Sequence, residues 1–296
     1  MNVVITIPAY NEEKTLGKVL KDIKRVMNST NYNYKILVVN DGSKDKTKEV
    51  AENEKVIVVS HPKNCGLADT FRTEMQKCLA LNADIIVHTD ADGQYKAEEI
   101  PNLIKEVENG TDLVLGSRFK GKIEKMPLLK RFGNKAFTRV ISQIIRQKIS
   151  DGQTGFRAFT KEVAKIPTTS NHTYTQEQII RASKEKFSIK DVPAYFAKRG
   201  GKTKSRLMKN PFDYAIKAWV NLLRIYRDYE PLKFFGFVGG SFVSLGVLLG
   251  IWITITLIQT GTVGGIPRVI LSALFIMTGV QIMLFGFLAD MNKINR

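Results

Sequence analysis

The sequence has few of the residues that build disulfide scaffolds and metal clusters, with two cysteines and three histidines among 296 residues. Cys65 and Cys78 lack metal-ligand spacing and a partner cluster, so we expect two reduced thiols, as on a cytosolic face. The N-terminus, MNVVITIPAYNEE, also lacks the basic start and long apolar core of a signal peptide. We interpret it as the first strand of a domain.

Acidic residues are scarce relative to basic ones, because 28 Asp and Glu stand against 45 Lys and Arg, a formal net charge of +17. This excess calls for an anionic partner: nucleic acid, an acidic membrane surface or a phosphorylated substrate. No helix-turn-helix, RNA-binding or zinc signature accompanies the charge, so no nucleic-acid partner is expected. Membrane lipids and phosphorylated substrates explain the basic balance better.

Long apolar runs occur only near the C-terminus. Residues 232–258 hold one charged residue, Lys233, and residues 269–289 hold none. Because about 20 apolar residues cross the hydrocarbon core, we expect transmembrane helices at about 232–258 and 267–289. Two buried helices of a soluble bundle are the alternative, and they would need an almost charge-free surface. The Gly-rich turn QTGTVGGIPR between the runs predicts a hairpin.

Basic residues gather at one end of this hairpin, and only Arg268 lies on the far turn. Those at the near end are Arg224, Arg227, Lys233, Lys293 and Arg296. The positive-inside rule therefore predicts a two-span protein of the cell membrane, with the soluble domain and both termini in the cytoplasm.

Residues 1–209 alternate short β-branched runs with segments of helical periodicity. We expect strands at 2–8, 34–41, 55–61, 83–90 and 111–117, and helices at 12–27, 47–54 and 67–81. This alternation predicts an α/β fold with a mostly parallel sheet and helices on both faces. Ligands bind such sheets beyond the carboxyl ends of the strands, where residues 8–12, 40–43 and 90–92 fall.

Two carboxylates, Asp90 and Asp92, follow the fourth expected strand. If the strand continues through them, both project to one side around the small Ala91. Like charges this close repel each other, and a cation would relieve that cost. Since Mg²⁺ is usually held by one or two carboxylates plus substrate phosphates, the pattern predicts Mg²⁺ or Mn²⁺ carrying a nucleotide diphosphate. A polar turn that enters a helix is the alternative.

Six further segments occur together in a known order. They are IPAYNEE (7–13), VVNDGSKDKT (38–47), NCGLADTFRTEM (64–75), DADGQYKAEEIPNLI (90–104), LGSRF (115–119) and DGQTGFRAF (151–159). Residues 2–207 thereby resemble family 2 glycosyltransferases with the GT-A nucleotide-diphospho-sugar transferase fold. They look most like polyprenyl-phosphate glycosyltransferases of the dolichol-phosphate mannosyltransferase type. The resemblance implies a hexosyltransferase that moves one sugar, with inversion, from a donor such as GDP-mannose or UDP-glucose to a polyprenyl or dolichyl phosphate.

The resemblance also implies a role for each matching residue. The nucleotide pocket would be lined by Pro8, Tyr10, Glu12 and Asp41. The diphosphate and its cation would be held by Asp90, Asp92 and Gln94. Asp151, a base or sugar-orienting group, and Arg157, a substrate contact or a structural salt bridge, would lie under the donor sugar. The acceptor and the departing diphosphate would be contacted by Arg118, Arg131, Asn134, Glu177 and Arg206.

Three positions depart from the family pattern. Asn40 stands where the first of two paired aspartates is usual, and Ala68 and Glu74 stand where glycines are frequent. These departures bear on the contacts with the donor base and leave the metal and acceptor signatures intact.

Two amphipathic segments, 126–147 and 210–230, interleave apolar side chains with Lys and Arg. This composition is typical of helices that lie in the bilayer interface, and ordinary packing against the domain is the alternative. We therefore divide the chain into a catalytic domain (1–209, including 126–147), a juxtamembrane helix (210–230) and a transmembrane hairpin (231–296).

Other functions stay open from the sequence. A non-catalytic membrane scaffold or a lipid-sugar translocation partner could use a decayed transferase domain, although Asp90, Asp92, Gln94 and Arg118 are all present. A polysaccharide synthase is disfavoured because the Q-x-x-R-W signature is missing. The sugar, the base, the polyprenol and the oligomeric state, a homo-oligomer included, are not given by the sequence.

Overall fold

The structure is a computed structural model that describes residues 1–169, 174–198, 211–263 and 265–294. Its internal contacts divide the chain into two compact units, Met1–Ala215 and Ile216–Arg296. Each unit is described by itself below. Arg206, which we expect at the acceptor side, lies outside the described residues.

The first unit is built on a seven-stranded sheet with the order β3-β2-β1-β4-β6-β5-β7. Its strands are β1 (Asn2–Ala9), β2 (Asn33–Asn40), β3 (Ile57–Ser60), β4 (Ile85–His88), β5 (Leu113–Ser117), β6 (Arg157–Thr160) and β7 (Ile189–Pro193). β1 pairs in parallel with β2 and β4, β2 with β3, and β5 with β7. Only β6 runs antiparallel to its neighbours β4 and β5. The predicted mostly parallel sheet is confirmed.

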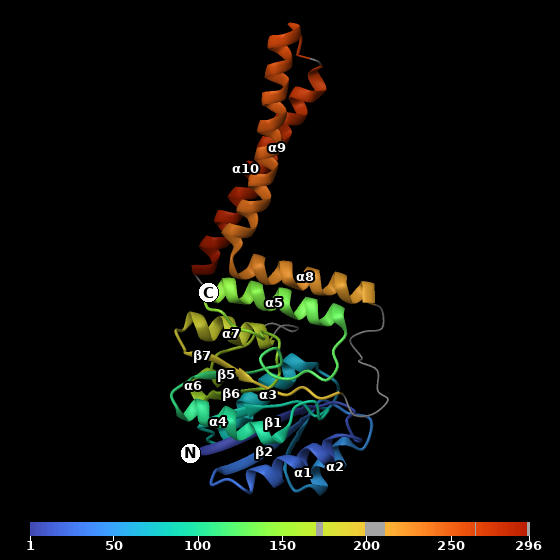
Figure 1. The fold of residues 1–296 in the computed structure, drawn as a ribbon, viewed down its shortest axis with the longest axis vertical. Helices are drawn as coiled ribbons and strands as arrows, with labels where there is room; N and C mark the ends of the chain where they lie inside the picture. The colour runs from blue at the N-terminus through green and yellow to red at the C-terminus, as the bar shows by residue number, and fades with distance from the viewer. Residues whose placement is uncertain (170–173, 199–210, 264, 295–296) are drawn as a thin grey trace. The chain divides into compact units, whose positions relative to one another are not determined.

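Helices cover both faces of this sheet, so that α1 and α7 lie on opposite sides of it (Figure 1). The helical elements of the first unit are α1 (Leu16–Met27), α2 (Thr47–Asn53), α3 (Leu67–Ala80), the 3-10 turn η1 (Ala97–Glu99), α4 (Ile100–Glu108), α5 (Leu128–Ile145), α6 (Lys161–Ala164) and α7 (Tyr174–Lys184). The crossovers between parallel strands place these helices against the sheet, as expected for an α/β fold.

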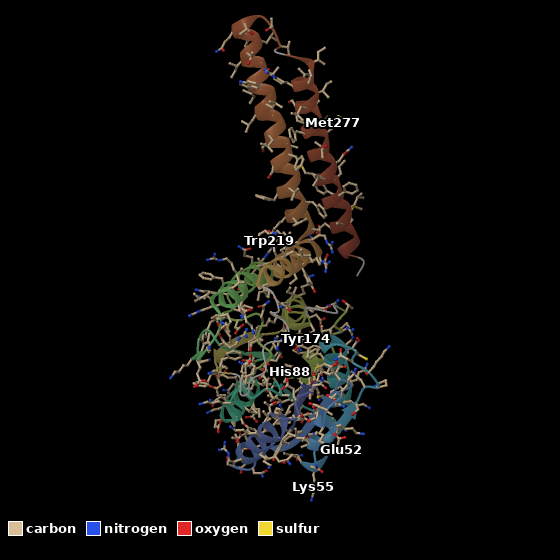
Figure 2. The ribbon with its side chains drawn as sticks, turned by 90° about the vertical axis from the view of Figure 1, so that its right-hand side faces the viewer. Glu52, Lys55, His88, Tyr174, Trp219 and Met277 are labelled. Carbon is tan, nitrogen blue, oxygen red and sulfur yellow. The ribbon has the colours of Figure 1, made fainter. Side chains whose placement is uncertain are left out.

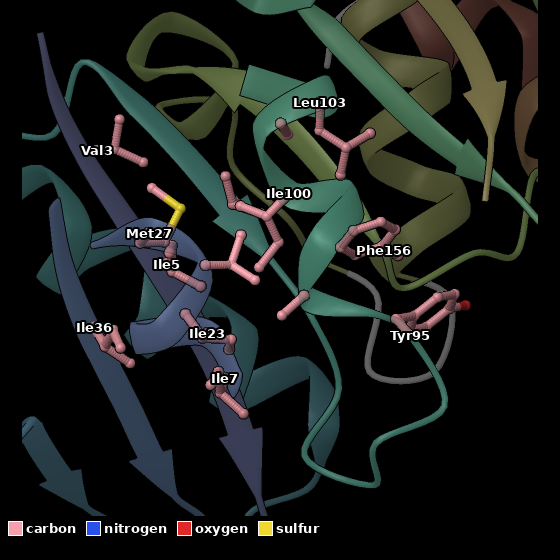
Figure 3. Packing of buried hydrophobic residues seen from close by; sticks show 14 of the residues in the cluster. Val3, Ile5, Ile7, Ile23, Met27, Ile36, Tyr95, Ile100, Leu103 and Phe156 are labelled. Atoms are coloured by element: carbon pink, nitrogen blue, oxygen red, sulfur yellow. The ribbon is translucent and has the colours of Figure 1, made fainter. Parts of the chain in front are cut away.

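The main hydrophobic core lies between the sheet and the helices α1, α2 and α4 (Figure 3). Alternate β1 residues Val3, Ile5 and Ile7 point into it and are fully buried. The helical spacing of Leu20 and Ile23 presents one face of α1 to the same core. Burial of each such side chain contributes about 1.5–3 kcal/mol, so this layer fixes the strand register.

The positions of several elements differ from the sequence prediction. β4 ends at His88, two residues before the acidic pair, and α1 begins at Leu16 rather than at residue 12. The Glu12 carbonyl accepts hydrogen bonds from the backbone amides of Thr15 and Leu16, which makes residues 12–15 a turn before the helix. β6 and β7 were not predicted, because four- and five-residue strands without clear alternation carry a weak signal.

The second unit contains two helices that are long and apolar enough to cross a membrane. They are α9 (Pro231–Thr260) and α10 (Ile266–Ile294), and α8 (Pro211–Tyr229) precedes them across the boundary between the units. Pro231 begins α9, and Gly261, with φ 71°, ends it in the left-handed region. Both predicted spans therefore coincide with helices.

Small residues let α9 and α10 approach closely. A Cβ added at Gly279 would lie 2.6 Å from the Gly239 carbonyl oxygen and 2.8 Å from the Val243 backbone nitrogen. About two helical turns away along the same interface, the Ser272 hydroxyl donates a 2.7 Å hydrogen bond to the Gly246 carbonyl. Close backbone approach and interhelical hydrogen bonds are the forces that join helices in lipid.

We expect Gly279→Leu to separate these helices, because the clash is with backbone atoms that cannot rotate away. Overpacking of this kind costs about 1–3 kcal/mol. Thermal unfolding of the full chain in detergent, followed by tryptophan fluorescence, measures the loss. Gly240→Leu is the matched control, since a Cβ at Gly240 meets no atom within 4 Å. Equal melting temperatures for the two variants would contradict the close contact.

Candidate active site

The acidic segment Asp90-Ala91-Asp92 is a turn at the edge of the sheet, not the end of a strand. The prediction that strand alternation aligns the two carboxylates is therefore wrong. The chain leaves β4 after His88, and Gly93 adopts φ 71°, which reverses its direction. Asp92 is buried, and its Oδ1 accepts a 3.0 Å hydrogen bond from the Gln94 amide. The turn, rather than a strand, sets the direction of this carboxylate.

Asp90 is half-buried and accepts no hydrogen bond from any residue in the described part of the chain. A Cβ added at Gly155 would lie 2.9 Å from its Oδ1, so the absent side chain leaves space for this carboxylate. An oxygen donor without a protein hydrogen-bond donor, beside a second carboxylate, fits a hard divalent cation such as Mg²⁺ or Mn²⁺. Asp90 and Asp92 are the residues that would hold it.

Gln94 ties this turn to the segment that follows β7. Its side-chain nitrogen donates to the Ala197 carbonyl at 3.1 Å, and its own carbonyl accepts from the Ala197 amide at 2.8 Å. Tyr95 forms a β-bridge with Phe196 next to these bonds. The structure thus assigns Gln94 a contact with the backbone, and its role as a metal ligand stays a prediction.

Arg118 and Asp151 form a buried, two-pronged ion pair. The Nε and Nη2 atoms of Arg118 donate to Oδ2 and Oδ1 of Asp151 at 2.6 and 2.8 Å. Burial opposes the positive charge, but the facing Asp151 carboxylate outweighs it, and the pKa of Arg118 is raised. Asp151 is fully buried, so in this structure it holds Arg118. Its role as a base stays a prediction.

Phe196 completes the surroundings of Arg118, since the guanidinium carbon lies 5.3 Å from its ring centroid. Nη1 of Arg118 donates to no residue that the structure describes. Two of the five N–H donors therefore hold Asp151, and others remain for a ligand anion. No sequence pattern indicates Phe196, because it lies 78 residues after Arg118 and outside every motif.

Asp41 organises the loop after β3. Its Oδ1 contacts His61 Nδ1 and the Cys65 amide, both at 2.8 Å, and its Oδ2 accepts from Asn64 and the Gly66 amide, both at 2.9 Å. Potential metal-ligating atoms of Asp41, His61 and Cys65 lie within 4.8 Å of one another. Because hydrogen bonds already occupy both Asp41 oxygens, we interpret this cluster as a set of contacts that holds the loop in place, and not as a metal site.

The loops after β1 and β2 hold each other at the same edge of the sheet. The Asn11 amide donates to the Ser43 hydroxyl at 2.9 Å, and the Glu12 amide donates to the Thr47 hydroxyl at 2.8 Å. Pro8 pairs with Val39 within the sheet, and Tyr10 and Glu12 follow in the loop. The predicted nucleotide-pocket residues therefore come from the end of β1 and from the loops after β1 and β2, and their contact with a nucleotide stays a prediction.

The residues predicted at the acceptor side are more dispersed. Arg131 is exposed on α5, whereas Asn134 is buried and its Nδ2 lies 3.9 Å from the Met126 sulfur. Glu177 is buried in α7 and accepts hydrogen bonds from Thr169 and Arg181. Within the described ranges, none of these three forms a hydrogen bond or ion pair with Asp90, Asp92 or Arg118.

Arg157 is fully buried and pairs with no carboxylate among the described residues. Its Nη1 donates to the Thr175 carbonyl and to Gln178 Oε1, and its Nη2 donates to the Thr154 carbonyl. Burial lowers its pKa below the ordinary value for arginine. Among the described residues neutral oxygen atoms surround the guanidinium in place of a salt bridge. A contact between Arg157 and substrate stays a prediction.

Curated proteins resemble this chain. A UDP-N-acetylglucosamine–dolichyl-phosphate N-acetylglucosaminyltransferase from Methanococcus voltae is 33% identical, over 64% of this chain and 84% of that protein. A dolichyl-phosphate hexose transferase from Haloferax volcanii is 33% identical, over 69% and 86%. A dolichol-phosphate mannosyltransferase from Pyrococcus furiosus is 29% identical and covers 93% of this chain and 78% of its own length.

The solved structures that resemble the chain share its fold at low identity. Glucosyl-3-phosphoglycerate synthase from Mycobacterium tuberculosis, in complex with Mn²⁺, UDP and phosphoglyceric acid, is 18% identical, with a TM-score of 0.56 over 75% of this chain and 78% of that one. Residues 4–166, more than half of the chain, match the family described as glycosyl transferase family 2. The chain thus has a GT-A-like α/β fold and belongs to glycosyl transferase family 2.

Proposed function

We propose that this glycosyltransferase moves one sugar from a nucleotide-diphospho-sugar to a polyprenyl or dolichyl phosphate, with inversion at the anomeric carbon. Two groups at one edge of the sheet carry the proposal: the Asp90 carboxylate, which accepts no hydrogen bond from the described residues, and the buried guanidinium of Arg118, held by Asp151. The names of the relatives support the lipid phosphate as acceptor and a nucleotide sugar as donor.

The carboxylates and Arg118 have different roles in the proposed reaction. A divalent cation held by Asp90 and Asp92 would neutralise the negative charge that builds on the leaving diphosphate. Arg118 carries a positive charge whose orientation Asp151 fixes before substrate arrives, and such preorganised charges lower barriers most. A monoester phosphate is largely dianionic at pH 7, so the acceptor scarcely needs a base. Positioning of the acceptor then matters more than its deprotonation.

Exposed apolar side chains and two long apolar helices support a lipid acceptor. α5 exposes Leu128 and Phe132, each 71% accessible, beside the exposed Arg131 and Lys135. In the second unit, α8 exposes Trp219, and α9 and α10 have the length and composition of spans. We propose that α5 and α8 lie in the interface, that the hairpin crosses the membrane, and that the catalytic domain and both termini are cytoplasmic.

Loss of the metal site is the first test. Asp92→Ala should lower kcat by on the order of 10²- to 10³-fold, because the diphosphate loses charge compensation. The assay measures radiolabelled lipid formed from polyprenyl phosphate and a panel of UDP- and GDP-sugars. EDTA should abolish the activity, and Mn²⁺ or Mg²⁺ should restore it.

Asp22→Asn, a change at a surface carboxylate of α1, is the matched control and should be active. Full activity of Asp92→Ala would contradict the metal role. Nucleotide binding by the wild-type chain without transfer to any lipid phosphate would instead favour a non-catalytic scaffold.

Cysteine labelling tests the nucleotide pocket. Cys65 is exposed in the loop that Asp41 holds, whereas Cys78 is buried and its pKa is raised by burial. UDP or GDP with Mn²⁺, at ten times its Kd, should slow alkylation of Cys65 about tenfold by mass action. Cys78 should stay unmodified in the folded chain, as mass spectrometry can show. An unchanged Cys65 rate at saturating nucleotide would place the pocket elsewhere.

The exposed face of α5 tests the membrane contact. The double variant Leu128→Ser with Phe132→Ser should raise the KM for polyprenyl phosphate in vesicles at least about tenfold, because transfer of even one such side chain is worth about 1.5–3 kcal/mol and about 1.4 kcal/mol is a tenfold change. The KM for the donor should not change. Ile57→Ser, at an exposed position of β3, is the control. A donor KM that rises together with the lipid KM would indicate damage to the domain instead.

A further inference from the structure

A row of polar side chains crosses the buried face of the sheet that α3 and α7 cover. Thr6 of β1 lies beside His88 of β4, and His88 lies opposite Arg157 of β6. Glu74 of α3 lies over the row, and the side chains of all four residues are fully buried. Buried charges are costly unless they are paired, so this row needs a physical explanation.

Glu74 and His88 are partners within this row. Glu74 Oε1 accepts a 3.0 Å hydrogen bond from Thr6, and Glu74 Oε2 lies 3.3 Å from His88 Nε2. These last two atoms are at ion-pair distance without hydrogen-bond geometry, and neither has another partner in the part of the chain that the structure describes. Phe71 and Tyr174 pack against the imidazole and keep water away (Figure 2 labels His88 and Tyr174).

The other ring nitrogen of His88, Nδ1, faces the backbone of Gly155. Nδ1 lies 2.7 Å from the Gly155 carbonyl, which can only accept, so Nδ1 carries a proton and donates it. The preceding carbonyl, that of Thr154, accepts from Arg157. The buried side chains of His88 and Arg157 thereby hold the carbonyl groups of residues 154 and 155.

The same glycine meets Asp90 on its other side. Because Gly155 has no side chain, its backbone can lie next to the Asp90 carboxylate, and a Cβ added there would come within 2.9 and 3.3 Å of the two carboxylate oxygens. A shift of the 154–155 segment would therefore displace the Asp90 carboxylate. Glu74, His88 and Gly155 form a continuous chain of contacts that ends at this carboxylate.

Glu74 is also a departure from the family pattern, since glycine is frequent at its position. A glycine there supplies no carboxylate, so the family resemblance does not account for the contact. We propose that Glu74 and His88 are a positioning pair that holds the Gly155 carbonyl and, through it, the Asp90 carboxylate in place for a divalent cation. This inference rests on the proposed metal site. Neither residue touches substrate or metal.

Matched variants in the full chain, purified in detergent, separate positioning from simple core packing. Glu74→Gln keeps the shape and the Thr6 hydrogen bond but removes the charge that faces His88. His88→Asn places an amide nitrogen near the Nδ1 position and keeps the donor to Gly155. His88→Gln places it near Nε2 and loses that donor. Met75→Ala, a buried change on the same helix, is the control for lost stability.

The first measurement is the Mn²⁺ concentration that gives half-maximal transferase activity. For Glu74→Gln and His88→Gln it should rise roughly 10- to 100-fold, the effect typical of residues that orient metal ligands. The donor KM at saturating Mn²⁺ should stay near the wild-type value. His88→Asn should recover most of the loss, and Met75→Ala should lower the melting temperature without changing the Mn²⁺ dependence.

The second measurement needs neither metal nor activity. Hydrogen exchange of peptides that cover residues 152–157 should be faster in Glu74→Gln and His88→Gln than in the wild type, and near wild type in His88→Asn. If His88→Gln does not fold, the isosteric variant Glu74→Gln alone tests the positioning role. Wild-type Mn²⁺ dependence and wild-type exchange in Glu74→Gln would overturn the inference. An inactive wild-type chain would count against the proposed function, and the exchange result would still decide the positioning role.

Discussion

Parallel pairing of β1 with β2 on one side and β4 on the other is the constraint on which the site depends. It brings the loops after residues 9, 40 and 88 to one edge of the sheet. The antiparallel β6 begins at the same edge with Arg157, so the segment that contains Asp151 and Gly155 arrives there from the opposite direction. Residues of the candidate site that are far apart in the chain, such as Arg118 and Asp151, therefore meet at one edge of the sheet.

The register of these strands is held by the apolar face that packs against α1 and α4. Val3, Ile5 and Ile7 alternate with residues of the other face, so a slip by one residue would bury polar Thr6 among them. Such a slip would also move the acidic turn relative to Gly155. The hydrophobic core therefore sets the positions of the polar groups, although it lies on the opposite face of the sheet from His88 and Arg157.

Sequence patterns predicted most of the helices and strands, because long apolar runs and helical spacing depend on residues that are close together in the chain. They predicted β1, β2, α3 and both C-terminal helices within a few residues. They misplaced the acidic pair, since the run up to residue 90 gives no sign that β4 ends at His88. They also missed every partner across the fold. Arg118 and Asp151 are 33 residues apart, and only the tertiary structure shows that they face each other.

The buried charges around the site are better explained by position than by stability. Removing charged groups from water costs about as much as their attraction returns, so apolar residues of similar volume would stabilise the fold at least as well. This chain nevertheless buries Arg118 with Asp151, and Glu74 with His88. Each pair fixes the direction of a group that an apolar residue could not orient. A site that compensates developing charge needs fixed directions, because freely moving charges would have to reorganise during the reaction. The need to orient groups at the site therefore explains the buried pairs. The apolar core on the other face supplies the stability that offsets the cost of burying them.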